Sequence, residues 1–259
     1  MIDKLKPREY NNPHFGVIAS GISTSSFDLT GLLAYYTFEE TTGNLINQST
    51  SPDSLGSAVD GVVTGTTRSL TGKISNSYGF ANSYVDSGNS DYIAIPNALE
   101  DAYVSSGALT INVWIYRTSA STNGEFFSLY DSGVSRGIEI SSTSSGFVSV
   151  STSNGLDVTS TTSMSAGVWY MVTLTIDLDN SVQTDYDAKI WVNASYNAND
   201  DSFTSFGTRT SSIYLGTLSH GNGQGYGFNG RMDELSVWNR PLTSDEIISL
   251  YNSGSGLSL

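Results

Sequence analysis

The stretch FNGRMDELSVWNRPLTSDEIISLY, residues 228–251, joins a strand pattern to a helix pattern. Thr243 is a favourable N-cap residue, and Glu246 follows it at the spacing of a capping box. Gly254 is suited to end the helix, because glycine readily adopts the left-handed conformation of a C-terminal cap. We therefore predict a last strand followed by one short helix. The residues expected to face the sheet are Ile247, Leu250 and Tyr251.

Upstream of this stretch, the chain repeatedly alternates apolar and polar residues with the two-residue period of half-buried strands. Turn signals such as Asn123-Gly124 separate these segments. Charged residues make up only 14% of the chain, and its many Ser, Thr, Asn and Gly residues suit strands and turns better than helices. The sequence therefore predicts an all-β sandwich over residues 31–259. The clearest alternating segments are GLLAYYTFEE (31–40), ALTINVWIYR (108–117), WYMVTLTIDLD (169–179), AKIWVNAS (188–195) and SSIYLGTLS (211–219).

The alternation also assigns residues to faces. In the first segment, one face is expected to hold Leu32, Ala34, Tyr36 and Phe38. Trp114 and Trp191 fall on the face opposite the main apolar stripe of their own segments. Their side chains are therefore expected outside the core between the sheets.

Composition excludes several classes of protein. The chain of 259 residues has no cysteine, so it has no disulfide, thiolate metal site or cysteine nucleophile. Its two histidines, His14 and His220, are too few for a multi-histidine metal centre. The sequence pI of about 4.2 argues against nucleic acids and anionic membrane surfaces as partners. No apolar run reaches the ~18 residues that span a bilayer.

Residues 1–30 differ from the rest and are predicted to be an extended N-terminal arm. Their charges sum to zero, so residues 31–259 carry the whole net charge of -14. No secretory signal pattern is visible in them. The arm is expected either to pack across its own domain or to dock on a neighbouring subunit. The residues predicted to make docking contacts are Lys4, Lys6, Arg8, Tyr10, His14 and Phe15.

Several of these segments together resemble a known family. The closing Gly-x-Met-Asp-Glu-Leu-x-Val-Trp-Asn-Arg pattern, the opening Tyr-x-Phe-Glu-Glu and the strand Ala-Gly-Val-Trp-Tyr-x-Val are similar to those of laminin-G-like, concanavalin A-like jelly rolls. The resemblance covers residues 31 to about 251 and implies two antiparallel sheets of about six or seven strands each. It leaves the function open, because this fold occurs in lectins, adhesins, hydrolases and structural modules.

Related glycosidases carry the pattern Glu-x-Asp-x-x-Glu, since glycoside hydrolysis needs two carboxyl groups. That pattern is absent here. Glu139 stands alone in its segment, and the adjacent Asp233 and Glu234 are expected on opposite faces of one strand. We therefore predict that the protein is not an enzyme.

The resemblance also implies a structural calcium ion. The positions that match the family's ligands are Glu39, Asp60 and Asp233. Asp233 is expected to share a face with Leu235 and Val237, where a carboxylate must be hydrogen-bonded, paired or bound to a cation. The alternative is that Asp233 forms an ion pair with Arg240 or caps a turn.

The loop HGNGQGYGFNG, residues 220–230, is the candidate ligand site. Its aromatic rings could stack on a sugar while its amides bond the sugar hydroxyls. The simpler alternative is a long turn between strands. The residues proposed to face a glycan are Asn222, Gln224, Tyr226, Phe228 and Asn229.

These observations favour a non-enzymatic virion surface protein, such as a phage head decoration, fibre or tail component. It would be made in the host cytoplasm, dock through residues 1–30 on other virion proteins or copies of itself, and stabilise the particle or adhere weakly to cell-surface glycan. The alternative is a carbohydrate-binding lectin or adhesin of a bacterial surface. A glycoside hydrolase, the third hypothesis, needs two carboxyl groups that converge in a cleft.

Overall fold

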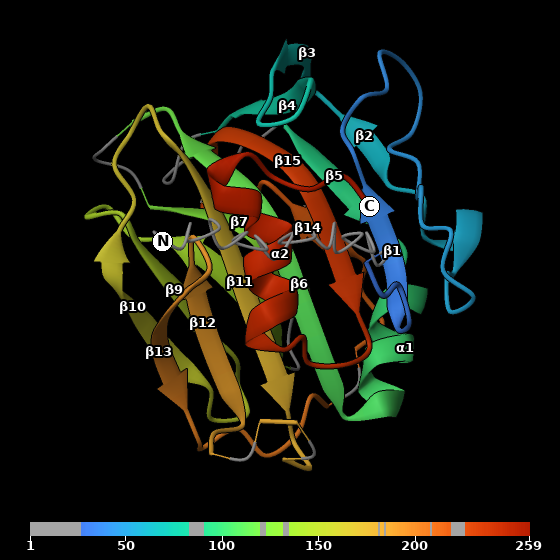
Figure 1. The fold of residues 1–259 in the computed structure, drawn as a ribbon. Coiled ribbons are helices and arrows are strands. Elements are labelled where there is room, and N and C mark those ends of the chain that lie inside the picture. Colours follow the sequence, from blue (N-terminus) through green and yellow to red (C-terminus); the bar gives the residue numbers. More distant parts are fainter. Residues whose placement is uncertain are drawn as a thin grey trace, which may run out of the picture.

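The computed structural model describes residues 27–82, 91–119, 123–131, 135–180, 182–183, 185–207, 209–218 and 226–259. These residues form two antiparallel sheets packed as a jelly-roll sandwich, which confirms the predicted fold class (Figure 1). The eight-stranded sheet has the order β13 (Ser195–Asp200), β12 (Ala188–Val192), β11 (Trp169–Asp177), β6 (Ala108–Arg117), β15 (Asn229–Trp238), β4 (Asn76–Ala81) and β3 (Thr67–Thr71), with β1 (Leu32–Tyr36) also paired to β15. The seven-stranded sheet has the order β10 (Asp157–Ser163), β9 (Phe147–Ser151), β8 (Ser135–Ser142), β7 (Gly124–Asp131), β14 (Ile213–Leu215), β5 (Tyr92–Ile95) and β2 (Val62–Thr64).

The main core lies between the two sheets and is built from alternate residues of their strands. On β6 and β11 the predicted faces are confirmed, because the alternating aliphatic residues enter this core while Trp114 faces away from it. On β1 one prediction is wrong. A β-bulge between Leu32 and Ala34 shifts the register there, so Leu32 leaves the face shared by Ala34, Tyr36 and Phe38.

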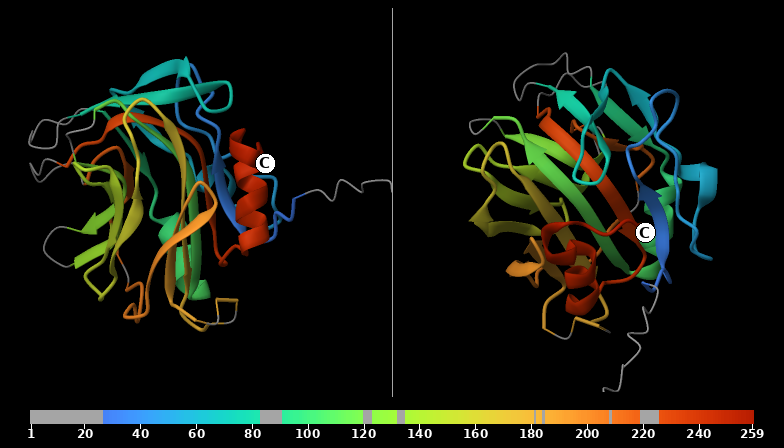
Figure 2. Two further views of the ribbon diagram at one scale, coloured as in Figure 1. Left: turned by 60° about the vertical axis from the view of Figure 1, so that its left-hand side comes forward. Right: turned by 45° about the horizontal axis from the view of Figure 1, so that its top comes forward.

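A second apolar cluster covers the outer face of the eight-stranded sheet beneath α2 (Ser244–Tyr251), which lies outside the sandwich (Figure 2). The predicted capping box of Thr243 and Glu246 is confirmed. The helix ends earlier than predicted, because Asn252 takes the left-handed conformation at the C-cap and Gly254 closes the 3-10 turn that follows (Asn252–Gly254).

The helix α1 (Ala98–Ser106) follows β5 and was not predicted. Its sequence signals are Glu100 and Asp101 in the first turn and Gly107 at a left-handed C-cap. A 3-10 turn also occupies Gly56–Val59. Neither α-helix in the described part of the chain is long and apolar enough to cross a membrane.

The last residues of the predicted arm pack on their own domain. The ring of Phe27 lies 5.8 Å from that of Trp238, and Nε of Arg240 donates to the carbonyl oxygen of Thr30 at 2.6 Å. Residues 1–26, which include every residue predicted to make docking contacts, lie outside the described residues.

Candidate functional site

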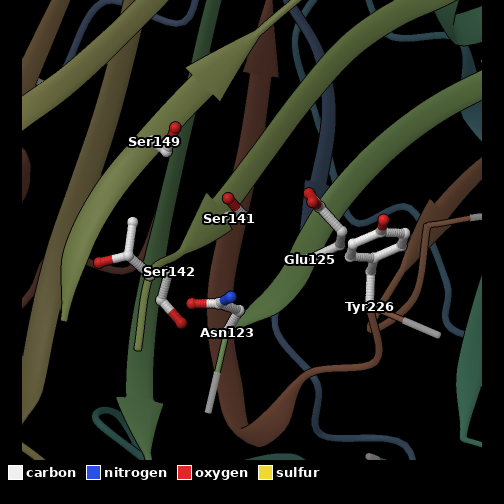
Figure 3. A pocket seen from close by; sticks show the side chains of 7 residues that line it. Asn123, Glu125, Ser141, Ser142, Ser149 and Tyr226 are labelled. Carbon is white, nitrogen blue, oxygen red and sulfur yellow. The ribbon is translucent and has the colours of Figure 1, made fainter. Parts of the chain in front are cut away.

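A polar groove lies on β7, β8 and β9 of the seven-stranded sheet (Figure 3). It consists of a pocket of ≈ 150 Å³ and a second pocket of ≈ 90 Å³, which share Glu125 and Tyr226. The larger pocket is lined by Asn123, Glu125, Ser141, Ser142, Thr143, Ser149 and Tyr226. The smaller pocket is lined by Glu125, Glu139, Leu218 and Tyr226.

Strand pairing places the polar side chains of the groove. Glu125 of β7 lies opposite Ser141 of β8, and Ser141 lies opposite Ser149 of β9, so the three form one row across three strands. Their chain neighbours Phe126 and Ile140 enter the core between the sheets. Because side chains alternate between the two faces of a strand, the row points away from the core.

A β-bulge adds a second carboxylate to this outer face. The register of β7 against β8 shifts between Glu125 and Phe127, and both Phe126 and Phe127 consequently enter the core. Ser128 therefore faces outward like Glu125, and Glu139 lies directly opposite Ser128. The carboxylates of Glu125 and Glu139 thus reach the same small pocket from neighbouring strands.

The backbone around Gly124 positions the ring of Tyr226. Segment 226–228 approaches β7 so closely that a Cβ on Gly124 would lie 2.8 Å from Cα of Phe228. The amide of Glu125 donates to the carbonyl oxygen of Tyr226 at 2.8 Å. Tyr226 itself has a φ of 114°, a conformation that residues other than glycine rarely adopt and that often marks a functional position. Its ring consequently lies beside the Glu125 side chain (Figure 3).

Two further tyrosines continue the outer face beyond the groove. Tyr214 of β14 pairs with Ser128 of β7, and its ring lies 5.9 Å from that of Tyr92 on β5. Both rings are partly exposed. This side of the sheet therefore combines hydroxyls, carboxylates and aromatic rings, which together suit a polyhydroxylated ligand.

The structure places the predicted ligand residues in different surroundings. Tyr226 lines both pockets. The prediction that Phe228 faces a glycan is wrong, because its side chain is 1% exposed and packs against Phe80 and Phe126 in the core. Nδ2 of Asn229 donates to the carbonyl oxygen of Asn82 at 3.4 Å. Asn222 and Gln224 lie outside the described residues.

A separate cluster of three acids lies on the eight-stranded sheet, where the strand that pairs with β15 changes from β4 to β1. The three are Glu39, Asp233 and Glu234. β15 pairs with β4 as far as Met232 and with β1 from Leu235, so Asp233 and Glu234 fall between the two partner strands. A register shift begins there, and Glu234 has a φ of 51°. The prediction that Asp233 shares a face with Leu235 is therefore wrong.

Asp233 and Glu39 bind the turn between β3 and β4. Oδ2 of Asp233 accepts from the amides of Lys73 (2.7 Å) and Ile74 (2.9 Å), while Oδ1 is buried without a hydrogen-bond partner. Glu39 accepts from the amide and the side chain of Asn76 at 2.8 and 2.6 Å. Arg240 pairs with Glu246 at 2.6 Å, so the proposed pairing of Asp233 with Arg240 is not observed.

Burial raises the pKa of two acids of this cluster, Asp233 and Glu234. It raises the pKa of Asp233 to about 8, with the charges of Glu234 and Glu39 adding to the effect. Burial also raises the pKa of Glu234 to about 7, although a hydrogen bond from the Tyr35 hydroxyl opposes the rise. The pKa of Tyr35 is raised by burial and by Glu234, so its hydroxyl stays a donor.

The acids of this cluster are not the three residues that were predicted as calcium ligands. Glu39 lies with Asp233 and Glu234, whereas Asp60 accepts from the amide of Asn47 at 2.9 Å. In the part of the chain that the structure describes, no three acidic or histidine side chains are grouped as metal ligands. The buried Oδ1 of Asp233 suits a hard cation, but calcium takes 6–8 oxygens. Calcium binding at this cluster stays a prediction.

Comparisons with known proteins agree with the jelly-roll fold. A family model described as the concanavalin A-like lectin/glucanases superfamily matches residues 87–248. A Trypanosoma rangeli sialidase in complex with sialic acid is similar with a TM-score of 0.64 and 15% identity, over 90% of this chain and 35% of that one. This chain therefore spans about a third of the length of the sialidase chains that it matches.

Two smaller structures are also similar. Domain 4 of AbnA, a GH43 extracellular arabinanase from Geobacillus stearothermophilus in complex with arabinotriose, has a TM-score of 0.59 and 20% identity, over 84% of this chain and 97% of that one. The binding domain of Paraclostridial Mosquitocidal Protein 1 has a TM-score of 0.62 and 14% identity, over 87% of this chain and 52% of that one. No curated protein matches the sequence. At these identities the likeness shows a shared fold.

These similarities overturn the prediction that the protein is not an enzyme. Structures of a sialidase and of a domain from an arabinanase share its fold, so that fold occurs within glycoside hydrolases. The prediction depended on the absence of a pattern along a single strand. The structure instead brings Glu125 and Glu139 to one pocket from two strands, a pairing that no single-strand pattern reveals.

Proposed function

We propose that this chain, which belongs to the concanavalin A-like lectin/glucanase superfamily, is a carbohydrate-binding domain. Its ligand would lie in the groove on β7, β8 and β9. The observation that carries the proposal is the Tyr226 ring beside a row of hydroxyl and carboxylate groups. The volume of ≈ 150 Å³ is below the ~300–1,000 Å³ of most small-molecule pockets, which suits one sugar residue at the end of a chain. Two similar structures hold sialic acid and arabinotriose, which supports a sugar as the class of ligand.

Replacing Tyr226 by alanine is expected to weaken glycan binding about tenfold, because the substitution removes both the ring and its hydroxyl from the groove. Binding is measured on an array of oligosaccharides that includes arabinotriose. Tyr196→Ala is the matched control, since Tyr196 is an exposed tyrosine on the other sheet and should leave binding unchanged. Equal binding by the Tyr226 variant would place the ligand elsewhere. If the unaltered protein binds no glycan, the proposed function is wrong.

The same incubations can be analysed for cleaved oligosaccharide. Hydrolysis of a glycoside requires two carboxyl groups about 5–9.5 Å apart, and Glu125 and Glu139 line one pocket. Cleavage that is lost in Glu139→Gln would extend the proposed function from binding to hydrolysis.

We further propose that residues 1–26 attach this domain to a larger assembly, either a virion or a bacterial surface. The support is the distinct charge of this segment, since all of the net charge of -14 lies in residues 31–259. A deletion should end at residue 26, because Phe27 and Thr30 contact Trp238 and Arg240. Such a deletion is expected to abolish incorporation into particles and to leave the melting temperature unchanged. Normal incorporation would refute this proposal without affecting glycan binding.

A further inference from the structure

We infer that Tyr116, Trp169 and Arg231 form a second sugar-binding surface on the outer face of the eight-stranded sheet. The inference rests on the proposed function for the class of ligand and adds a site to it. The groove lies on the outer face of the seven-stranded sheet, so the two surfaces point away from each other. One copy of the domain would therefore hold two glycan chains at once.

Strand pairing places the three side chains of the second surface in one row. Arg231 of β15 lies opposite Tyr116 of β6, and Tyr116 lies opposite Trp169 of β11. The chain neighbours Met232 and Ile115 enter the core between the sheets. Because side chains alternate between the two faces of a strand, Arg231 and Tyr116 point outward. Trp169 lies on the same outer face, where it packs against the edge of the second apolar cluster.

The helix α2 covers the middle of this outer face and leaves the row partly open. Tyr251 of α2 stacks on the ring of Trp114, which is 2% exposed. Two positions further along β6, Tyr116 is only half-buried, and so are Trp169 and Arg231. A ligand on this face of the sheet can therefore contact all three side chains.

Contacts within the protein already order the row. The rings of Tyr116 and Trp169 lie 5.5 Å apart at an interplanar angle of 54°, and Cζ of Arg231 lies 4.9 Å from the centre of the Tyr116 ring. Nη1 of Arg231 also donates to the carbonyl oxygen of Thr71 on β3 at 3.0 Å. Because these contacts restrict the three side chains, binding a ligand costs little further side-chain entropy.

The chemistry of the row suits a sugar. The C–H groups of a sugar ring form apolar patches that pack on aromatic rings, and Tyr and Trp offer large apolar surfaces. A guanidinium has five N–H donors, and the bond to Thr71 uses one of them, so Arg231 can donate to sugar hydroxyls beside the rings. Its charge strengthens such hydrogen bonds. A sheet face buries less of a ligand than a groove does, so we expect this surface to bind about tenfold more weakly than the groove.

The oligosaccharide array that tests the groove also tests the second surface, with Tyr226→Ala as the starting protein. This variant is expected to retain the weaker binding, because its row is intact. Adding Trp169→Ala should weaken that remaining binding at least about tenfold. Adding Arg231→Gln instead should weaken it about fivefold, since this change removes the charged donor and keeps both rings.

Two measurements keep the test independent of folding. Trp169 also packs against the second apolar cluster, so the melting temperature of each variant is compared with that of Tyr226→Ala. Arg231→Gln leaves that cluster intact and decides the result if Trp169→Ala is destabilised. Tyr196→Ala in the same background is the matched control, because Tyr196 is an exposed tyrosine on the same sheet outside the row. It should leave the remaining binding unchanged.

The outcomes separate this inference from the function on which it rests. If the unaltered protein binds no glycan, the carbohydrate-binding function fails and the second surface fails with it. If the unaltered protein binds glycan and Tyr226→Ala binds none, the function stands and the second surface is wrong. Remaining binding that neither Trp169→Ala nor Arg231→Gln weakens would also overturn the inference, because the sugar would then lie elsewhere.

Discussion

Replacing Trp114 by alanine is expected to lower the free energy of unfolding by about 4 kcal/mol, the typical cost of deleting a large buried side chain. Trp114 is 2% exposed on the outer face of the eight-stranded sheet. Its ring stacks on that of Tyr251 at 5.7 Å with an interplanar angle of 16°, and Nζ of Lys73 lies 4.5 Å from its centre. The substitution therefore removes the surface on which α2 and the turn between β3 and β4 both pack.

Urea unfolding of the purified protein measures this loss. Trp191→Ala is the matched control, because Trp191 is only partly buried at the edge of the same cluster and packs on the exposed Tyr196. Trp191→Ala should lower the free energy of unfolding clearly less than Trp114→Ala does. A loss below about 1 kcal/mol for Trp114→Ala, or an equal loss in both variants, would mean that the second cluster contributes little to holding α2 in place.

The local features of this fold were predictable from sequence because they depend on near neighbours. The capping box of Thr243 and Glu246 spans three residues, and the alternation in β6 and β11 repeats every second residue. The bulges were not predictable in the same way. Leu32 changes face and Glu234 takes a positive φ because of the strands that pair beside them, and one strand's sequence does not specify its partners.

The residues of the groove were hard to predict for the same reason, because they depend on which strands pair. Tyr226 was predicted because an aromatic residue stood out in a glycine-rich loop, whereas Glu125, Ser141 and Ser149 were missed. These three come from three strands, and only their register makes them one row. The Asn123-Gly124 turn signal was the available clue, since glycine there lets the segment at Tyr226 approach β7.

With a chelator present, the protein is expected to lose stability as the pH rises from about 5 to about 8. In the folded state the pKa of Asp233 is raised to about 8 and that of Glu234 to about 7, from ordinary values of 3.8 and 4.5. Between these limits the folded protein binds protons that the unfolded chain has released, so folding is favoured at the lower pH. The stabilisation is complete below the unfolded values and is lost as the pH passes the folded ones. The expected loss is about 6 kcal/mol, or on the order of 20 °C in melting temperature.

Asp233→Asn is expected to flatten this pH dependence. The amide oxygen can still accept from Lys73 and Ile74, and its NH₂ group takes the place of the protonated oxygen beside Glu39 and Glu234. Asp201→Asn is the control and should leave the slope unchanged, because Asp201 is exposed. A flat profile in the unaltered protein would contradict the assignment of buried protons to this cluster.

The same melts test the predicted calcium ion, because a cation and a proton would neutralise the same carboxylates. If calcium binds there, adding it at pH 8 should raise the melting temperature of the unaltered protein and have less effect on Asp233→Asn. The gain should also fade towards pH 5, where protons occupy the site. An unchanged midpoint at pH 8 with calcium and with chelator would count against an ion. The cluster would then be stabilised by protonation and by its hydrogen bonds from backbone amides, the Asn76 side chain and the Tyr35 hydroxyl.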